Sequence, residues 1–172
     1  QLKTIGMDDV MEELNRQAVR IAKDVASEVE GTLVAGNICN VWAYDPGDRA
    51  TQDYVRAIYE EQVRWAAEEG VDFIIAETLA HVGEAKLALE VIKTHNLPSV
   101  VTYNALADKT FDDYDFVTAC EIAADLGADV VGMNCSRGPA TLMPILQKIR
   151  DRIDCHVAAL PTPHMTDEAH PT

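Results

Sequence analysis

Residues 129–139 are Asp-Val-Val-Gly-Met-Asn-Cys-Ser-Arg-Gly-Pro, and this stretch predicts a buried strand followed directly by a helix. The β-branched run is typical of a strand, and the Gly-Pro pair favours a helix start. In parallel α/β proteins, reacting groups gather where strands end, because side chains there project into the mouth of the sheet or barrel. Cys135 occupies such a strand end. Its thiolate could act as a nucleophile or a soft metal ligand, and a small buried hydrophobe is the simpler alternative.

The same alternation of strand and helix extends outward along the whole chain. The predicted strands begin 27 to 39 residues apart, close to the roughly 30 residues of a βαβ unit. Near-continuous apolar strands between amphipathic helices predict a parallel sheet or a parallel barrel. The predicted strands are 32–36, 71–76, 98–102, 129–134 and 156–160, and the predicted helices are 8–30, 51–69, 85–92, 113–126 and 140–152.

The number of these units favours an incomplete (β/α)8 TIM barrel with about five parallel strands. A complete barrel typically needs about 250 residues, whereas this chain has 172. We therefore expect residues 1–172 to form the central portion of one barrel domain, without its N-terminal strands and its last strand. A five-stranded doubly wound sheet is the alternative, although Gly31, Gly36 and Gly47 do not form its usual G-x-G-x-x-G turn.

The composition excludes several kinds of partner. The formal net charge is −15, from 29 acidic and 14 basic residues, which argues against nucleic acid or an anionic membrane. No apolar run approaches the roughly 20 residues that span a bilayer, and no signal peptide pattern is visible. Four cysteines in a chain of this length do not suggest a secreted disulfide scaffold, so we expect a cytoplasmic protein.

Three segments carry a resemblance to a known family. They are Glu30-Gly-Thr-Leu-Val-Ala-Gly-Asn37, Val71-Asp-Phe-Ile-Ile-Ala-Glu-Thr78 and Gly127-Ala-Asp-Val-Val-Gly-Met-Asn-Cys135. Together they resemble the homocysteine S-methyltransferase family, and within it the betaine–homocysteine methyltransferase branch and its bacterial relatives. The resemblance implies a (β/α)8 barrel that holds a zinc ion at the C-terminal ends of its strands. In this family three cysteine thiolates bind the zinc, and the thiol of homocysteine joins them.

The resemblance also implies roles for individual residues. Cys135 matches the first zinc cysteine, and Glu77 matches the carboxylate that binds the ammonium group of homocysteine. The other two zinc cysteines form an adjacent pair after the eighth strand, and this chain has no Cys-Cys pair. We therefore expect this chain to be inactive alone. Human-type relatives in the family tend to have tyrosine after the glutamate, whereas this chain has Thr78.

Asn134 and Thr102 are further candidates for substrate contacts, because both lie near the ends of predicted strands. The alternative for Asn134 is a structural one, in which its amide satisfies backbone groups at the strand end or orients a ligand. Glu77 likewise has a structural alternative as a carboxylate that bridges loops. Beyond the metal site, the sequence offers no separate catalytic residue.

The predicted chemistry follows from the thiol of the substrate. A free thiol with a pKa near 8.5 is mostly protonated at pH 7, and zinc coordination deprotonates it. The expected reaction moves a methyl group from an onium donor, betaine-like or an S-methyl sulfonium compound, to homocysteine and forms methionine. A methylated folate is a further alternative for the donor. The sequence also leaves open whether the whole protein forms a homo-oligomer. The alternatives are a non-catalytic barrel subunit and a barrel enzyme with Cys135 as covalent nucleophile.

Overall fold

A computed structural model describes residues 6–162 of the chain. Helices and strands alternate along it, as the sequence pattern predicts. The elements are a short 3-10 helix (Asp8–Val10), α1 (Met11–Ala26), β1 (Ala35–Cys39), α2 (Arg49–Glu68), β2 (Phe73–Leu79), α3 (Val82–Thr94), β3 (Ser99–Asn104), α4 (Phe116–Asp125), β4 (Val130–Asn134), α5 (Pro139–Arg150) and β5 (His156–Leu160).

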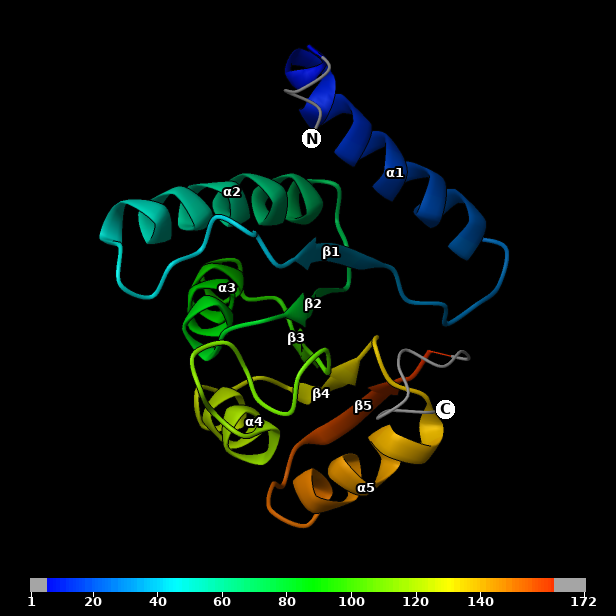
Figure 1. Cartoon of the computed structure of the whole chain (residues 1–172). Helices are drawn as coiled ribbons and strands as arrows, with labels where there is room; N and C mark the ends of the chain where they lie inside the picture. The colour runs from blue at the N-terminus through cyan, green and yellow to red at the C-terminus, as the bar shows by residue number, and fades with distance from the viewer. Residues whose placement is uncertain (1–5, 163–172) are drawn as a thin grey trace.

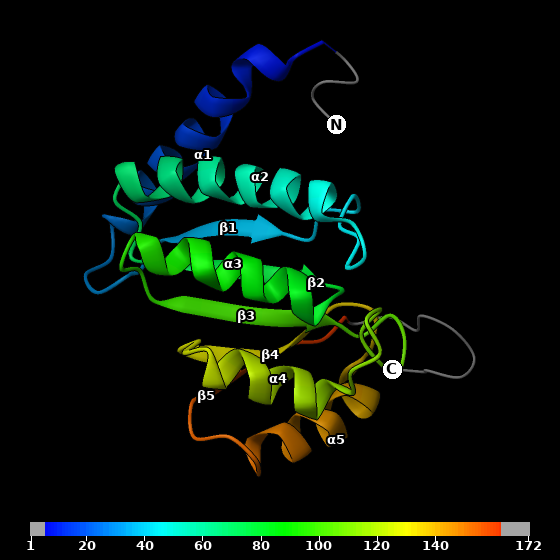
Figure 2. The same cartoon turned by 90° about the vertical axis from the view of Figure 1, so that its left-hand side faces the viewer.

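The five strands form one parallel sheet in the order β1-β2-β3-β4-β5. The sheet is curved, and α2 to α5 lie along its outer, convex face (Figures 1 and 2). A doubly wound sheet would reverse its strand order and carry helices on both faces. The sequential order therefore confirms the predicted partial (β/α)8 architecture and rules out the doubly wound alternative.

The hydrophobic core lies between the strands and the outer helices. Alternate side chains of the central strands, such as Ile74, Val101 and Met133, are completely buried in this layer. The intervening residues face the concave side of the sheet, because successive side chains of a strand point to opposite faces. This alternation assigns Glu77 on β2 and Asn134 on β4 to the concave side, at the ends of their strands.

The first strand begins three residues later than the sequence predicts. The prediction was 32–36, with Gly36 near the end of the strand, whereas β1 runs from Ala35 to Cys39. Gly36 lies inside the strand, and the close approach of α2 requires glycine there. An added β-carbon would lie 2.7 Å from the Cβ of Ala66. The buried apolar residue of the strand is Ile38, whereas Leu33 is exposed.

Helix α1 differs from the other helices in that none of its described side chains is buried. It contacts the C-terminal end of α2 through charges. Arg20 pairs with Glu69 at 2.7 Å, Lys23 donates to the Glu69 carbonyl at 2.6 Å, and Arg16 pairs with both Glu68 and Glu69. Hydrogen bonds from these arginines lower the pKa values of both carboxyl groups. Among the described residues, no helix is both long and apolar enough to cross a membrane.

Candidate functional site

The candidate site lies on the concave side of the sheet, where β1 to β4 end. The strand register pairs Cys39 with Glu77 and Asn104 with Asn134. Asn37 Nδ2 donates a hydrogen bond of 2.9 Å to Glu77 Oε1, so a side chain from the middle of β1 holds the Glu77 carboxylate. Glu77, on β2, and Cys135, directly after β4, are the two principal residues that the sequence predicts. One amide side chain, that of Asn134, connects these two segments.

A bulge in β2 shapes the backbone at Glu77. Ala76 pairs with Val101 and Leu79 pairs with Tyr103, so Glu77 and Thr78 together oppose a single residue of β3, Thr102. Thr78 has a φ of 62°, a left-handed conformation that β-branched residues rarely adopt. Such a conformation costs on the order of 1–3 kcal/mol and persists only where its surroundings enforce it.

Asn134 provides that enforcement from β4. Its Oδ1 accepts from the Thr78 backbone N–H at 2.9 Å, and its Nδ2 donates to Thr78 Oγ1 at 2.7 Å. The same Nδ2 lies 3.2 Å from Cys135 Sγ. Asn134 is only 1% exposed, and its amide contacts two atoms of Thr78 on β2 and the sulfur of Cys135 after β4. These contacts correspond to the structural alternative for this residue, and its predicted substrate contact stays a prediction.

Cys135 lies at the turn where β4 ends. Cys135 and Ser136 have φ values of 61° and 62°, so two consecutive non-glycine residues are left-handed. The Cys135 N–H donates to the Leu160 carbonyl at 3.0 Å, which ties the turn to β5. Ser136 Oγ donates to Asn104 Oδ1 at 2.6 Å, which ties the turn to β3. The half-buried thiol is therefore held on a turn anchored on both sides.

Thr102 faces the concave side opposite the bulge and is completely buried. Its Oγ1 has no hydrogen-bond partner among the described residues. A buried hydroxyl without a partner is unfavourable, so this atom needs a polar partner that the described residues do not supply. The predicted substrate contact of Thr102 stays a prediction.

Arg137 secures the next part of the turn. It is 6% exposed, and its guanidinium donates to the carbonyls of Ala105 and Ala107, both at 2.9 Å, and to the Asp108 carboxylate at 2.7 Å. A planar guanidinium suits several acceptors at once. Arg137 thereby joins the turn after β4 to the loop that follows β3.

A buried carboxyl group, Glu84 on α3, lies behind the end of β1. Its Oε1 accepts from the Val41 N–H at 2.5 Å and from Tyr59 Oη at 2.8 Å, and its Oε2 lies 3.9 Å from His81 Nδ1. Burial raises the pKa of Glu84 to about 7. The sequence analysis missed this residue, although Glu84 lies one turn before Ala88 on the apolar stripe of its helix, where a carboxylate is unexpected.

The described residues could provide part of a binding site for a soft metal ion. Cys135 offers a half-buried thiol at a strand end, which suits one ligand of a thiolate site. Over residues 6–162, no group of three or more His, Cys, Asp and Glu side chains could hold a metal ion. Cys120 is buried in the core, where burial raises its pKa to about 12, so it does not serve as a thiolate. Cys135 is therefore a candidate ligand, and the described residues do not form a complete site.

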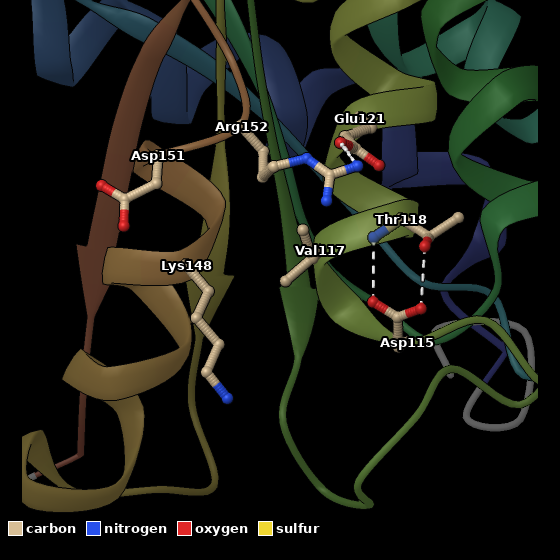
Figure 3. Close-up of a pocket in the computed structure, with 7 residues that line it drawn as sticks. All are labelled: Asp115, Val117, Thr118, Glu121, Lys148, Asp151 and Arg152. Atoms are coloured by element: carbon tan, nitrogen blue, oxygen red, sulfur yellow. Dashed lines mark hydrogen bonds and ion pairs between the residues drawn. The ribbon is translucent and has the colours of Figure 1, made fainter.

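A separate groove of about 470 Å³ lies between α4 and α5 on the outer face (Figure 3). Its walls include Asp115, which caps α4, and the Arg152–Glu121 ion pair of 2.9 Å. None of Glu77, Thr102, Asn134 and Cys135 lines it. The groove therefore belongs to the helical surface and not to the candidate site.

Known proteins that this chain resembles include homocysteine S-methyltransferases. The sequence model of the homocysteine S-methyltransferase family matches residues 1–171. The S-methylmethionine–homocysteine S-methyltransferase BHMT2 of Pongo abelii is 32% identical over 149 residues, 85% of this chain and 39% of that protein. Betaine–homocysteine S-methyltransferase 1 of Xenopus tropicalis is 30% identical over 165 residues, 91% of this chain and 40% of that protein. The chain thus spans about two fifths of the length of these relatives.

Solved structures show the same fold. The homocysteine methyltransferase MmuM from Escherichia coli, in its apo form, matches with a TM-score of 0.77 and 16% identity over 92% of this chain and 63% of that chain. Its metallated form matches with a TM-score of 0.75, also at 16% identity, over 91% of this chain and 60% of that chain. The described residues therefore share their fold with these two structures.

Proposed function

This chain belongs to the homocysteine S-methyltransferase family, and we propose that the whole protein transfers a methyl group from an onium donor to homocysteine, forming methionine. The observation that carries the proposal is the joint position of Glu77 and Cys135. They lie at the ends of β2 and β4, and the Asn134 side chain links the two ends directly. Homocysteine has an ammonium group and a thiol, which a carboxylate and a thiolate-bound metal would recognise.

We assign the substrate contacts as follows. Glu77 accepts hydrogen bonds from the ammonium group, and Asn37 holds the carboxylate in place at 2.9 Å. The buried Oγ1 of Thr102 meets a polar group of the substrate or an ordered water. The Asn134 amide already hydrogen-bonds to Thr78. A contact between Asn134 and the substrate would therefore replace one of these hydrogen bonds.

We propose zinc as the cofactor, with Cys135 as one of its ligands. The other ligands would come from parts of the whole protein beyond residues 6–162, since no three potential ligands come together among the described residues. When bound, zinc would hold the homocysteine sulfur as a thiolate, the nucleophilic form. The contribution of this chain is to fix Cys135 on an anchored turn, through the Leu160 carbonyl and Asn104.

The donor is proposed only as a chemical class. One relative is named for S-methylmethionine and another for betaine, which are a sulfonium and a quaternary ammonium compound. In both, a positive charge makes the methyl group a good target for displacement and leaves a neutral product centre. We therefore propose an onium donor.

We further propose that residues 1–172 are the central portion of one barrel domain in a cytoplasmic protein. The curated relatives are about two and a half times as long as the part that this chain matches. In a barrel, substrate-binding side chains come from the ends of several strands. The methyl-transfer activity is therefore assigned to the whole protein, and this chain alone is expected to be inactive.

The test measures methionine formation and zinc content in the whole protein. Glu77→Gln should raise the KM for homocysteine at least tenfold, because it removes the charge that faces the ammonium group. Cys135→Ser should lower both zinc content and activity, whereas Cys155→Ser, at a half-buried thiol before β5, should change neither. Full zinc occupancy in Cys135→Ser would refute the ligand assignment. Methyl transfer that survives complete removal of zinc would favour Cys135 as a covalent nucleophile instead.

A further inference from the structure

The amide of Asn134 makes a reciprocal pair of hydrogen bonds with Thr78. The Thr78 backbone N–H donates to Asn134 Oδ1 at 2.9 Å, and Asn134 Nδ2 donates to Thr78 Oγ1 at 2.7 Å. The two residues are 56 positions apart in the sequence and lie on β2 and β4, with β3 between them. The pair therefore bridges two strands that do not hydrogen-bond to each other in the sheet.

The residues next to this bridge are the two principal site residues. Glu77 directly precedes Thr78, and Cys135 directly follows Asn134. Asn134 Nδ2 also lies 3.2 Å from Cys135 Sγ. A change in the bridge would therefore alter the position of the carboxylate and of the thiol relative to each other.

The backbone at Thr78, and at Cys135 beside the bridge, is held away from its preferred conformation. Thr78 and Cys135 are both left-handed, with φ values of 62° and 61°. Asn96 and Asp113 are also left-handed, but asparagine and aspartate adopt this conformation readily in turns. Thr78 lies within a strand and is β-branched, so only its contacts hold it there.

We propose that Thr78 and Asn134 are positioning residues that fix the separation of Glu77 and Cys135 and so match the site to the length of homocysteine. This inference rests on the proposed function. Homocysteine carries its thiol one methylene farther from the amino group than cysteine does. A fixed separation between the carboxylate and the metal-bound thiolate site favours the longer amino acid, whereas a relaxed separation admits the shorter one more easily.

The test compares variants of the whole zinc-loaded protein with homocysteine and with cysteine as methyl acceptors. Thr78→Val keeps the β-branched shape and deletes the hydroxyl, and we expect it to lower the homocysteine-to-cysteine ratio of kcat/KM about fivefold, as loss of one hydrogen bond would. Thr78→Ser keeps the hydroxyl and should retain the ratio within twofold. Thr94→Val deletes a hydroxyl that donates to the Val91 carbonyl at the far end of α3, and it should leave the ratio unchanged.

A double variant separates positioning from general stability. Asn134→Ala removes every contact of the bridge, so adding Thr78→Val to it should lower the ratio no further. Hydrogen exchange provides a readout in the metal-free protein, where Asn134→Ala should increase exchange at the Thr78 amide at least tenfold. If one single variant does not fold, the other carries the same test.

The outcomes distinguish the two proposals. If the unmodified protein transfers no methyl group to homocysteine, the proposed function is wrong. If the unmodified protein is active, and Thr78→Val changes the activity with both acceptors by the same factor, the positioning role is wrong. Additive effects of Thr78→Val and Asn134→Ala would overturn it as well.

Discussion

Substitution of Glu84 by glutamine should change how the stability of the protein depends on pH. Burial raises the pKa of Glu84 from its ordinary value of 4.5 to about 7, and the residue is only 1% exposed. The folded protein therefore binds the Glu84 proton more tightly than the unfolded chain does. The resulting stabilisation is fully present below pH 4.5 and is lost as the pH rises through 7. The difference in the Glu84 pKa between the folded and unfolded states corresponds to about 3 kcal/mol of stability. Roughly 2–3 kcal/mol of this is lost between pH 5 and pH 8.

Glutamine cannot ionise, but its carbonyl oxygen can still accept from the Val41 N–H and Tyr59 Oη. The Glu84→Gln protein should therefore gain stability relative to the unmodified protein as the pH rises, by roughly 2–3 kcal/mol between pH 5 and pH 8. Urea unfolding followed by circular dichroism at several pH values measures this difference. Burial lowers the pKa of His81, and its Nδ1 lies 3.9 Å from Glu84 Oε2, so the measured difference includes the response of His81 to loss of the Glu84 charge.

Glu90 provides a matched control on the same helix, because its side chain is 59% exposed and pairs with Arg56. Glu90→Gln should change the free energy of unfolding by less than about 1 kcal/mol, with the same difference at each pH. A constant difference between Glu84→Gln and the unmodified protein from pH 5 to pH 8 would refute the reasoning. It would mean that the Glu84 proton is bound equally well in the folded and unfolded states.

Two further substitutions test the packing and the anchoring near the site. Gly132→Ala would bring a β-carbon within 2.0 Å of the Ala158 carbonyl oxygen, so we expect urea unfolding to show that the free energy of unfolding falls by about 3 kcal/mol or more. The control Gly47→Ala, in an exposed turn, should lower it by less than about 1 kcal/mol. Arg137→Lys cannot reproduce the forked contacts with Ala105, Ala107 and Asp108, so we expect a loss of about 2 kcal/mol and faster proteolysis in the loop after β3. Unchanged stability in either variant would contradict the respective contact.

Much of the fold could be predicted because its signals are local. Apolar strands and amphipathic helices alternate at the spacing of βαβ units, and the predicted and observed elements overlap along the chain. The error at β1 arose from Gly36, which in isolation suggests the end of a strand. The close approach of Ala66 on α2 and Ile74 on β2 explains why glycine lies inside the strand instead. That contact depends on tertiary packing, so no local pattern could reveal it.

The candidate site was predictable only at the level of strand ends. Glu77 and Cys135 follow apolar strands, and a parallel topology brings such ends to one edge of the sheet. The left-handed conformation of Thr78 gives no signal in the sequence, because threonine seldom adopts it. Glu84 did leave a signal, a carboxylate on an apolar helix stripe, but its partners Val41 and Tyr59 lie on other segments of the chain.

The bulge in β2 connects a requirement of the backbone with the geometry of the site. A regular strand would pair the Thr78 N–H with its neighbour, whereas the bulge removes that partner and a buried N–H needs a replacement. Asn134 Oδ1 is that replacement, at 2.9 Å. Because the same side chain also lies against Cys135 Sγ, the group that satisfies the bulge links it to the predicted metal ligand. Asn134→Leu should therefore destabilise the protein more than Thr78→Val does, because it leaves the Thr78 N–H unpaired, whereas Thr78→Val leaves that hydrogen bond in place.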